Sequence, residues 1–166
     1  MTPWTRLLRS KSIEADPPKE KNKDEAYLCD NTICSMLEGY ENIKSIDVQW
    51  GDIDSANHVN NVNYLRWVES ARIAFILQLN NGRLINEDNV GAVVAWQDCK
   101  YIRPVTFPDT VLVGVKRTEI LDDRIVLETK IFSQQQERLV AISHQHLVSY
   151  DYKRKEKAPI PLNWIY

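Results

Sequence analysis

Residues 48–72 read VQWGDIDSANHVNNVNYLRWVESAR, in which two acids lead through a polar turn into a largely apolar run. The acids are Asp52 and Asp54, and the turn contains His58, Asn60 and Asn61. The first turn of a helix presents unpaired backbone N–H groups and a partial positive charge. A carboxylate beside such donors suits acyl transfer, because negative charge develops on a carbonyl oxygen during the attack. The stretch therefore predicts a reactive site at the start of a long buried helix.

The apolar run predicts a helix from about Asn61 to Leu79, because the Asn-Asn-Gly sequence at 80–82 is a typical helix end. Apolar residues recur along the run at i, i+3 and i+4 steps, which places their side chains on one face. Further apolar positions widen that face, as is typical of a helix wrapped by a sheet. The predicted buried face consists of Tyr64, Val68, Ala71, Phe75 and Leu79.

Five β-like runs accompany this helix. One run, residues 43–50, precedes it, and four follow at about 90–102, 110–119, 124–133 and 138–151. Polar turns at 122–123 and 134–136 separate the last three runs, as expected for antiparallel neighbours. We therefore expect an α+β fold in which a five-stranded antiparallel sheet wraps around one long helix.

The order of these residues resembles the active-site signature of the 4-hydroxybenzoyl-CoA thioesterase family, whose members have the hotdog fold. That signature runs aromatic-x-Asp-x-Asp, a short turn, His-Val-Asn-Asn, then Tyr and aromatic-x-Glu-x-x-Arg. A second matching piece is the Tyr-Ile-Arg-Pro sequence at 101–104 followed by Asp109, and the resemblance covers roughly residues 43–162. The signature residues here are Trp50, Asp52, Asp54, His58, Val59, Asn60, Asn61, Tyr64, Trp67, Glu69 and Arg72.

Two departures from the family pattern lie in turns. Residues 55–57 are Ser-Ala-Asn where many relatives carry a Gly before the His, so the backbone of this turn is expected to differ. Pro108 replaces the usual Gly before Asp109 and stiffens that turn. Neither departure removes a catalytic group.

The resemblance implies a hotdog thioesterase that hydrolyses an acyl-CoA, or another acyl thioester, to a carboxylic acid and a free thiol. It places Asp54 as the nucleophile or as the general base for water, although an Asp near a turn is equally suited to capping a helix. Asp52 points to the opposite side if both acids lie on extended chain, so we expect it to brace the turn. The resemblance also implies at least a homodimer, with sheets joined edge to edge and the site between protomers.

Two further residues complete the expected catalytic group. His58 either orients Asp54, contacts the substrate or satisfies backbone groups of the turn. Asn61 is the expected N-cap of the helix, with the N–H groups around residues 62–63 polarising the substrate carbonyl.

Three residues are expected to bind the substrate. Tyr64, one turn into the helix, closes the pocket. Glu69 is a rival catalytic acid, but its spacing from Arg72 at i, i+3 favours a salt bridge. Arg103, and the Lys-Arg-Lys run at 153–155, are candidates for contact with coenzyme A phosphates.

The bulk properties exclude several classes of protein. A chain of 166 residues with a net charge of −2 predicts one domain and gives no electrostatic case for a nucleic-acid or anionic-membrane partner. Three cysteines, at 29, 34 and 99, cannot all pair and match no zinc motif, which favours a reducing compartment. No apolar run approaches the roughly 20 residues that cross a bilayer. His144 and His146 have no third ligand at suitable spacing, so neither a metal nor another cofactor is expected.

The first forty residues differ in character from the rest. Residues 1–13 contain three basic residues and no acid, which resembles a mitochondrial transit peptide, although a basic disordered tail gives the same composition. Residues 14–25 read as a solvated linker. We therefore divide the chain into an extension, 1–40, and a hotdog domain, 41–166, and expect a mitochondrial or cytoplasmic protein.

Other functions fit the sequence less well. It lacks a serine elbow, a P-loop and a dinucleotide fingerprint. Ala56 and the absence of alternating strands and helices exclude a two-aspartate phosphatase, and Ala56 and Asn57 exclude a calcium loop. The serious rival is a catalytically inactive hotdog module that acts as an acyl-binding or assembly subunit, because a fold alone does not guarantee activity. A dehydratase on the same fold is a weaker alternative.

Overall fold

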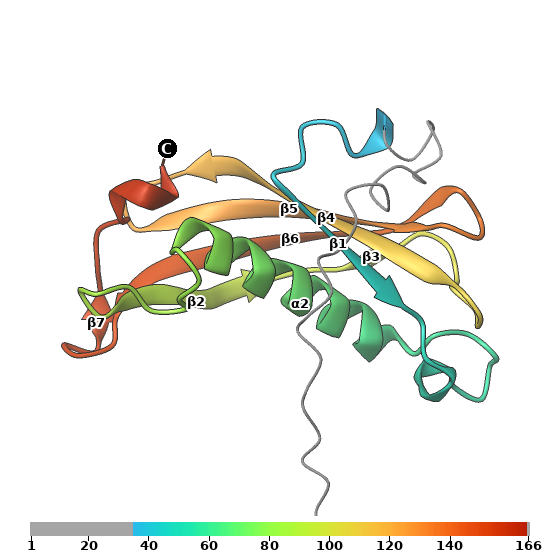
Figure 1. Ribbon diagram of the computed structural model, residues 1–166. Helices are drawn as coiled ribbons and strands as arrows, with labels where there is room; N and C mark the ends of the chain where they lie inside the picture. The colour runs from blue at the N-terminus through green and yellow to red at the C-terminus, as the bar shows by residue number, and fades with distance from the viewer. Residues whose placement is uncertain (1–34, 166) are drawn as a thin grey trace, which may run out of the picture.

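The computed structural model describes residues 35–165, and in them one long helix lies along one face of a curled antiparallel sheet (Figure 1). The predicted transit peptide, the linker and the first two cysteines lie outside the described residues. No helix in the described part of the chain is long and apolar enough to span a membrane. In chain order the elements are β1 (Asn42–Asp47), η2 (Trp50–Asp52), α2 (Asn61–Leu79), β2 (Val90–Gln97), β3 (Lys100–Tyr101), β4 (Thr110–Ile120), β5 (Arg124–Ser133), β6 (Arg138–Asp151), β7 (Glu156–Lys157) and η3 (Leu162–Trp164).

The predicted hotdog architecture is confirmed. Within residues 35–165 the strand order is β1-β4-β5-β6-β2, and two short strands, β3 and β7, also pair with β6 to make seven. The expected run at 90–102 is divided into β2 and β3 at residues 98–99, and β2 itself has a register shift on β6 between Val94 and Trp96. The first strand is also shorter than expected: β1 ends at Asp47, and the 3-10 turn η2 begins at Trp50.

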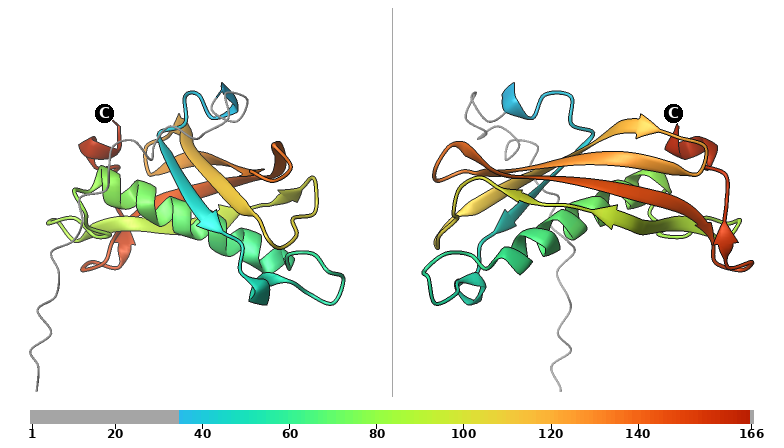
Figure 2. Two further views of the ribbon diagram at one scale, coloured as in Figure 1. Left: turned by 45° about the vertical axis from the view of Figure 1, so that its right-hand side comes forward. Right: turned by 180° about the vertical axis from the view of Figure 1, so that it is seen from behind.

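The core lies between α2 and the face of the sheet that it covers (Figure 2). The helix begins and ends where the sequence predicted, and four of the five residues of its predicted apolar face are buried, whereas Leu79 is half-buried. The side chains that face α2 occupy every second position of β4, and the intervening residues 112 and 114 are buried as well, so this part of the sheet is covered on both faces. The fully buried members of this core include Val68, Ala71, Phe75, Val111, Val113, Val115, Ile125, Leu127 and Ile131.

The segment before β1 packs on the other face of the sheet, over Gly114 of β4. A Cβ atom on Gly114 would lie 2.5 Å from Leu37 Cδ2 and 2.9 Å from Tyr40 Cδ1, so only glycine lets these side chains approach so closely. The Tyr40 hydroxyl donates a hydrogen bond of 2.6 Å to Glu128. Lys116 lies 5.0 Å from the centre of the Tyr40 ring and 3.2 Å from the Glu128 carboxylate. The segment before β1, which contains Leu37 and Tyr40, is therefore part of the folded domain.

Arg117 of β4 links two distant segments. Its guanidinium pairs with the Glu41 carboxylate at 2.6 Å and donates a hydrogen bond of 2.5 Å to the carbonyl oxygen of Trp164. Burial alone would raise the pKa of Glu41, but the contacts with Arg117 outweigh it and hold that pKa below its usual value. The indole of Trp164 is fully buried and donates to Asn80 Oδ1 at 2.7 Å, which joins η3 to the end of α2.

Candidate active site

The turn that precedes α2 is braced by Asp52. The Asp52 carboxylate accepts a hydrogen bond of 2.9 Å from the backbone N–H of Gln49. Its carbonyl oxygen accepts from the backbone N–H of Asn60 at 2.9 Å and from the Asn63 side chain at 3.1 Å. We expected Asp52 to brace the turn from a stretch of extended chain, but it lies in the 3-10 turn η2.

Asp54 opens a tight loop that His58 closes. The Asp54 N–H donates to the His58 carbonyl oxygen at 2.9 Å, and Asp54 Oδ1 accepts from the Ala56 N–H at 2.8 Å. Asn57 has a φ of 61°, in the left-handed region that asparagine tolerates better than most non-glycine residues. Asn57 can therefore adopt a backbone conformation that otherwise favours glycine. Within the described residues, Asp54 Oδ2 makes no hydrogen bond.

The cap of the helix is Asn60, and the expectation that Asn61 is the N-cap is wrong. Asn60 has a non-helical ψ of 137°, and its side chain accepts from the Val62 N–H at 3.0 Å. Its carbonyl oxygen accepts from the Asn63 N–H at 2.9 Å. The two amides that we expected to polarise a substrate are therefore already bonded. Asn61 is the first helical residue, and its N–H has no partner among residues 35–165.

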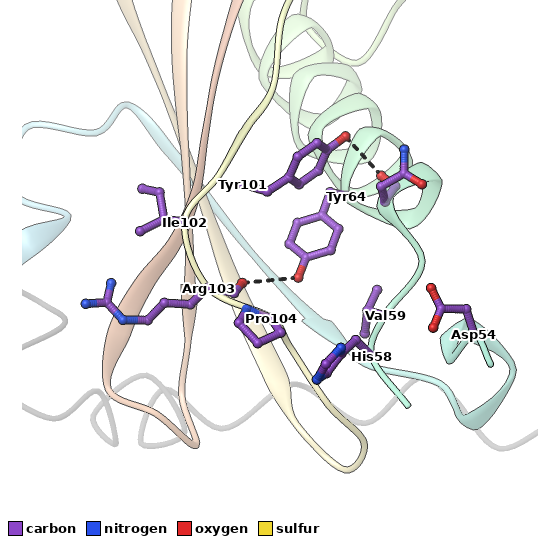
Figure 3. A pocket seen from close by; sticks show the side chains of 9 residues that line it. Asp54, His58, Val59, Tyr64, Tyr101, Ile102, Arg103 and Pro104 are labelled. Carbon is purple, nitrogen blue, oxygen red and sulfur yellow. Dashed lines mark hydrogen bonds between the residues drawn. The ribbon is translucent and has the colours of Figure 1, made fainter. Parts of the chain in front are cut away.

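A pocket of about 380 Å³ lies at this end of the helix and contains most of the predicted site (Figure 3). Its walls come from the turn before α2, from the first turn of α2, and from the segment that follows β3. Five predicted residues meet here, namely Asp54, His58, Asn61, Tyr64 and Arg103, together with Val59, Tyr101, Ile102 and Pro104.

Two tyrosines hold the wall opposite the turn. The buried Tyr64 hydroxyl accepts a hydrogen bond of 3.0 Å from the Val105 N–H and donates to the Arg103 carbonyl oxygen at 3.5 Å. Burial raises the pKa of Tyr64. The Tyr101 ring meets the Tyr64 ring edge to face at 5.2 Å, and its hydroxyl donates to the Asn61 carbonyl oxygen at 3.4 Å. Tyr101 was not among the predicted site residues, although it belongs to the Tyr-Ile-Arg-Pro piece that supplied Arg103.

His58 and Arg103 present polar side chains to the same pocket. The His58 ring is exposed and makes no hydrogen bond with the described residues. Arg103 Nη1 donates to the Leu139 carbonyl oxygen at 3.2 Å, and the side chain extends away from Asp54 (Figure 3). The Arg103 guanidinium therefore lies at the border of the pocket, away from the Asp54 carboxylate.

Other predicted groups lie elsewhere. Glu69 is farther along α2, does not line this pocket, and forms the expected ion pair with Arg72 at 3.7 Å. Arg154 pairs with the Asp151 carboxylate at 2.6 Å in the turn after β6, and the run at 153–155 does not line the pocket either.

The two histidines of β6 have neighbours of their own. The His144 ring lies 3.3 Å from the Asp98 carboxylate, and the His146 ring packs against Trp96 at 5.0 Å between ring centres. Across residues 35–165 no group of three or more His, Cys, Asp or Glu side chains could hold a metal ion.

Comparison with known proteins places this fold among thioesterases. Residues 48–165 match the thioesterase-like superfamily. No curated protein matches the chain. Among solved structures, the PA2801 protein from Pseudomonas aeruginosa is 29% identical and superimposes with a TM-score of 0.68, covering 75% of this chain and 95% of that one.

Two other similar structures are thioesterases. The BH1999 gentisyl-coenzyme A thioesterase is 26% identical, with a TM-score of 0.65, and the match covers 75% of this chain and 99% of that one. A thioesterase from Thermus thermophilus, solved with coenzyme A and Zn, is 26% identical with a TM-score of 0.63 over 74% of this chain and 93% of that one.

Proposed function

Because the chain belongs to the thioesterase-like superfamily, we propose that it hydrolyses an acyl-CoA to a carboxylic acid and free coenzyme A. The observation that carries the proposal is the pairing of two groups in one pocket. Asp54 offers a carboxylate oxygen that makes no hydrogen bond among the described residues, and Asn61 offers a backbone N–H at a helix N-terminus. The gentisyl-coenzyme A thioesterase and the coenzyme A complex among the similar structures support this substrate class.

We infer different tasks for the two oxygens of Asp54 from the hydrogen bonds of the turn. The Ala56 N–H holds Oδ1 and fixes the orientation of the carboxylate, which leaves Oδ2 to react. Oδ2 either attacks the thioester carbonyl carbon or removes a proton from the water that attacks it. In the first case the C–S bond breaks, coenzyme A leaves as a thiolate that takes up a proton, and water then hydrolyses the acyl-aspartyl anhydride.

The carbonyl oxygen becomes negatively charged in either route. The Asn61 N–H is a preorganised donor for that charge, and the positive end of the α2 dipole adds to the stabilisation. His58, which is exposed on the same pocket, contacts the substrate or orients the carboxylate. Tyr64 and Tyr101 form the wall against which the thioester lies, and Arg103 is the candidate ligand for a coenzyme A phosphate.

We further propose that two copies of the chain join along β2. In residues 35–165, β6 is the one strand that pairs with β2, and the loop before β2 bridges only its start, at Gly91, so the rest of its other edge presents free N–H and C=O groups. The strand also exposes Val93, Val94 and Trp96. Edge-to-edge pairing of β2 would cover these side chains. Light scattering tests this, and a monomer at micromolar concentration would contradict it.

The decisive experiment measures thiol release from short, long and aromatic acyl-CoAs by wild type and by Asp54→Asn. Loss of a catalytic acid or base lowers the rate by roughly 100-fold or more. Asp52→Asn is the matched control, because it makes the same change on a carboxylate that only braces the turn. We expect it to retain activity within about tenfold of wild type.

Each outcome of this comparison has a distinct meaning. Equal loss in both variants, with folding intact, would assign the effect to the charge of the turn and not to Asp54. Full activity in Asp54→Asn would move the chemistry to another acid, of which Glu69 is the first to test. Absence of turnover with every substrate, in wild type, would favour an acyl-binding or assembly module.

A further inference from the structure

The ring of Tyr101 closes one side of the pocket around Asp54. Tyr101 belongs to β3, whereas Asn61 and Tyr64 belong to the first turn of α2, and all three line the pocket (Figure 3). The Tyr101 hydroxyl donates to the Asn61 carbonyl oxygen at 3.4 Å, and its ring meets the Tyr64 ring edge to face at 5.2 Å. Tyr101 therefore reaches from the sheet to the helix, beside the residue whose N–H is free to bind a carbonyl oxygen.

The two tyrosines differ in how firmly they are held. Tyr64 is 3% exposed, and its hydroxyl accepts the N–H of Val105, so its ring is fixed in the core. Tyr101 is 45% exposed, and the bond of its hydroxyl to Asn61 is long. It is not on the β2 edge that the proposed pairing would cover. An aromatic ring of this kind offers a rigid apolar surface to a molecule in the pocket.

The position of this ring limits how far an acyl group can extend along α2. This step rests on the proposed function, in which the Asn61 N–H holds the thioester carbonyl. Tyr64 follows Asn61 by three residues, which is about 4.5 Å along the helix axis. An acyl chain of about four carbons spans that distance. Beyond it, the paired rings of Tyr64 and Tyr101 lie between the helix and β3 (Figure 3).

We propose that Tyr101 sets the length of the acyl group, and that the pocket accepts short acyl chains of about four carbons. The ring acts by occupying the space that the far end of a longer chain needs. Leu65 lies one turn beyond Asn61 on the same face of α2, and Cys99 precedes Tyr101 by two residues; both are half-buried. Removal of the ring would therefore let a longer chain reach apolar side chains.

Binding of S-alkyl thioethers of coenzyme A tests the proposal without turnover, because a thioether is not hydrolysed. Isothermal titration calorimetry on the full chain compares S-butyl-CoA with S-decyl-CoA. An apolar pocket discriminates a single methylene group by roughly tenfold or more. We therefore expect wild type to bind the butyl compound at least about tenfold more tightly than the decyl compound. Tyr101→Ala removes the ring and should reverse this preference.

Two matched controls isolate the effect of the ring. Tyr101→Phe keeps the ring and removes only the hydroxyl, so it should keep the preference for the butyl compound. Ile102→Ala truncates the next residue of the same wall, but the Ile102 side chain points away from Tyr64 and Asp54 (Figure 3), so the preference should again match that of wild type. Tyr101→Leu, of intermediate size, should give an intermediate ratio of affinities if circular dichroism shows that the alanine variant is unfolded.

Thiol release from butanoyl-CoA and decanoyl-CoA separates this proposal from the proposed hydrolysis. The ratio of kcat/KM for the two substrates should shift toward decanoyl-CoA in Tyr101→Ala, as the ratio of affinities does. If no variant releases thiol and the thioether preference still reverses, the hydrolysis is wrong and Tyr101 sets the length of a bound chain.

Three results would overturn the role of Tyr101. The first is a wild type that binds neither thioether, or binds the decyl compound as tightly as the butyl compound. The second is a folded Tyr101→Ala or Tyr101→Leu variant with the wild-type ratio of affinities. The third is a shift of equal size in Ile102→Ala, which would assign the effect to any truncation of this wall.

Discussion

Tyr64→Phe tests whether the wall of the first pocket is held by one buried hydroxyl. The substitution removes the oxygen that accepts the Val105 N–H at 3.0 Å and keeps the ring, which packs against Trp67 and Tyr101. Val105 is completely buried, so its N–H has no access to water once the oxygen is gone. The change therefore affects hydrogen bonding with little change in apolar burial.

The size of the effect follows from these contacts. A buried N–H left without a partner costs about 1–3 kcal/mol. The second bond of the hydroxyl, to Arg103 at 3.5 Å, is too long to add much. We expect a loss of about 2 kcal/mol in the free energy of unfolding, or about 5–10 °C in Tm for a domain of this size.

Urea unfolding followed by circular dichroism measures this loss, with Tyr101→Phe as the matched control. The Tyr101 ring is exposed, and its hydroxyl makes one long bond of 3.4 Å, so its removal should change stability by less than about 0.5 kcal/mol. If Tyr64→Phe were as stable as Tyr101→Phe, the hydroxyl would not be what holds the segment after β3 in place.

Three further substitutions test other parts of the fold. Asn60→Ala removes the cap of α2 and should lower the free energy of unfolding by about 0.5–2 kcal/mol in urea; an unchanged midpoint would refute the capping assignment. The folded pKa of Glu41 is lowered by Arg117, so the stability from this pair is present above the unfolded pKa of about 4.3 and is lost as the pH falls through the folded pKa. Glu41→Gln should therefore flatten the acid limb of a plot of urea midpoint against pH, and an identical limb would contradict the pairing. Gly114→Ala should cost about 1–3 kcal/mol, because its Cβ would lie 2.5 Å from a covering leucine side chain. Gly51→Ala, where a Cβ meets nothing within 4 Å, should be neutral, and equal losses in the two glycine variants would refute the packing argument.

Local signals in the sequence were sufficient to predict the helix. The apolar period and the Asn-Asn-Gly stop gave its bounds, since both act within a few residues. The cap was misassigned by one residue because the choice between Asn60 and Asn61 depends on the ψ of Asn60. That residue donates its N–H to the carbonyl oxygen of Asp52, a contact that the residue types do not specify. Likewise, the run at 90–102 is divided at residues 98–99, where the Asp98 carboxylate accepts the backbone N–H of His144, a contact with a distant strand that no local pattern contains.

The candidate site was predictable where its residues belong to one motif. Asp54, His58, Asn61 and Tyr64 lie within eleven positions, so the turn and the first helical turn bring them together. Assigning the free amide to Asn61 required the structure, because the N–H groups of the next two residues already donate hydrogen bonds to Asn60.

The guanidinium of Arg117 has a consequence for protein engineering. It touches the carboxylate of Glu41 and the carbonyl oxygen of Trp164, so the approach to β1 and the turn η3 meet at one side chain. Chain ends that lie close together are what circular permutation and domain insertion require. A linker from residue 165 to residue 35, which keeps the packed segment before β1, would therefore close the domain into a ring, and new termini could then be opened in an exposed turn such as 134–136 without separating the strands of the sheet.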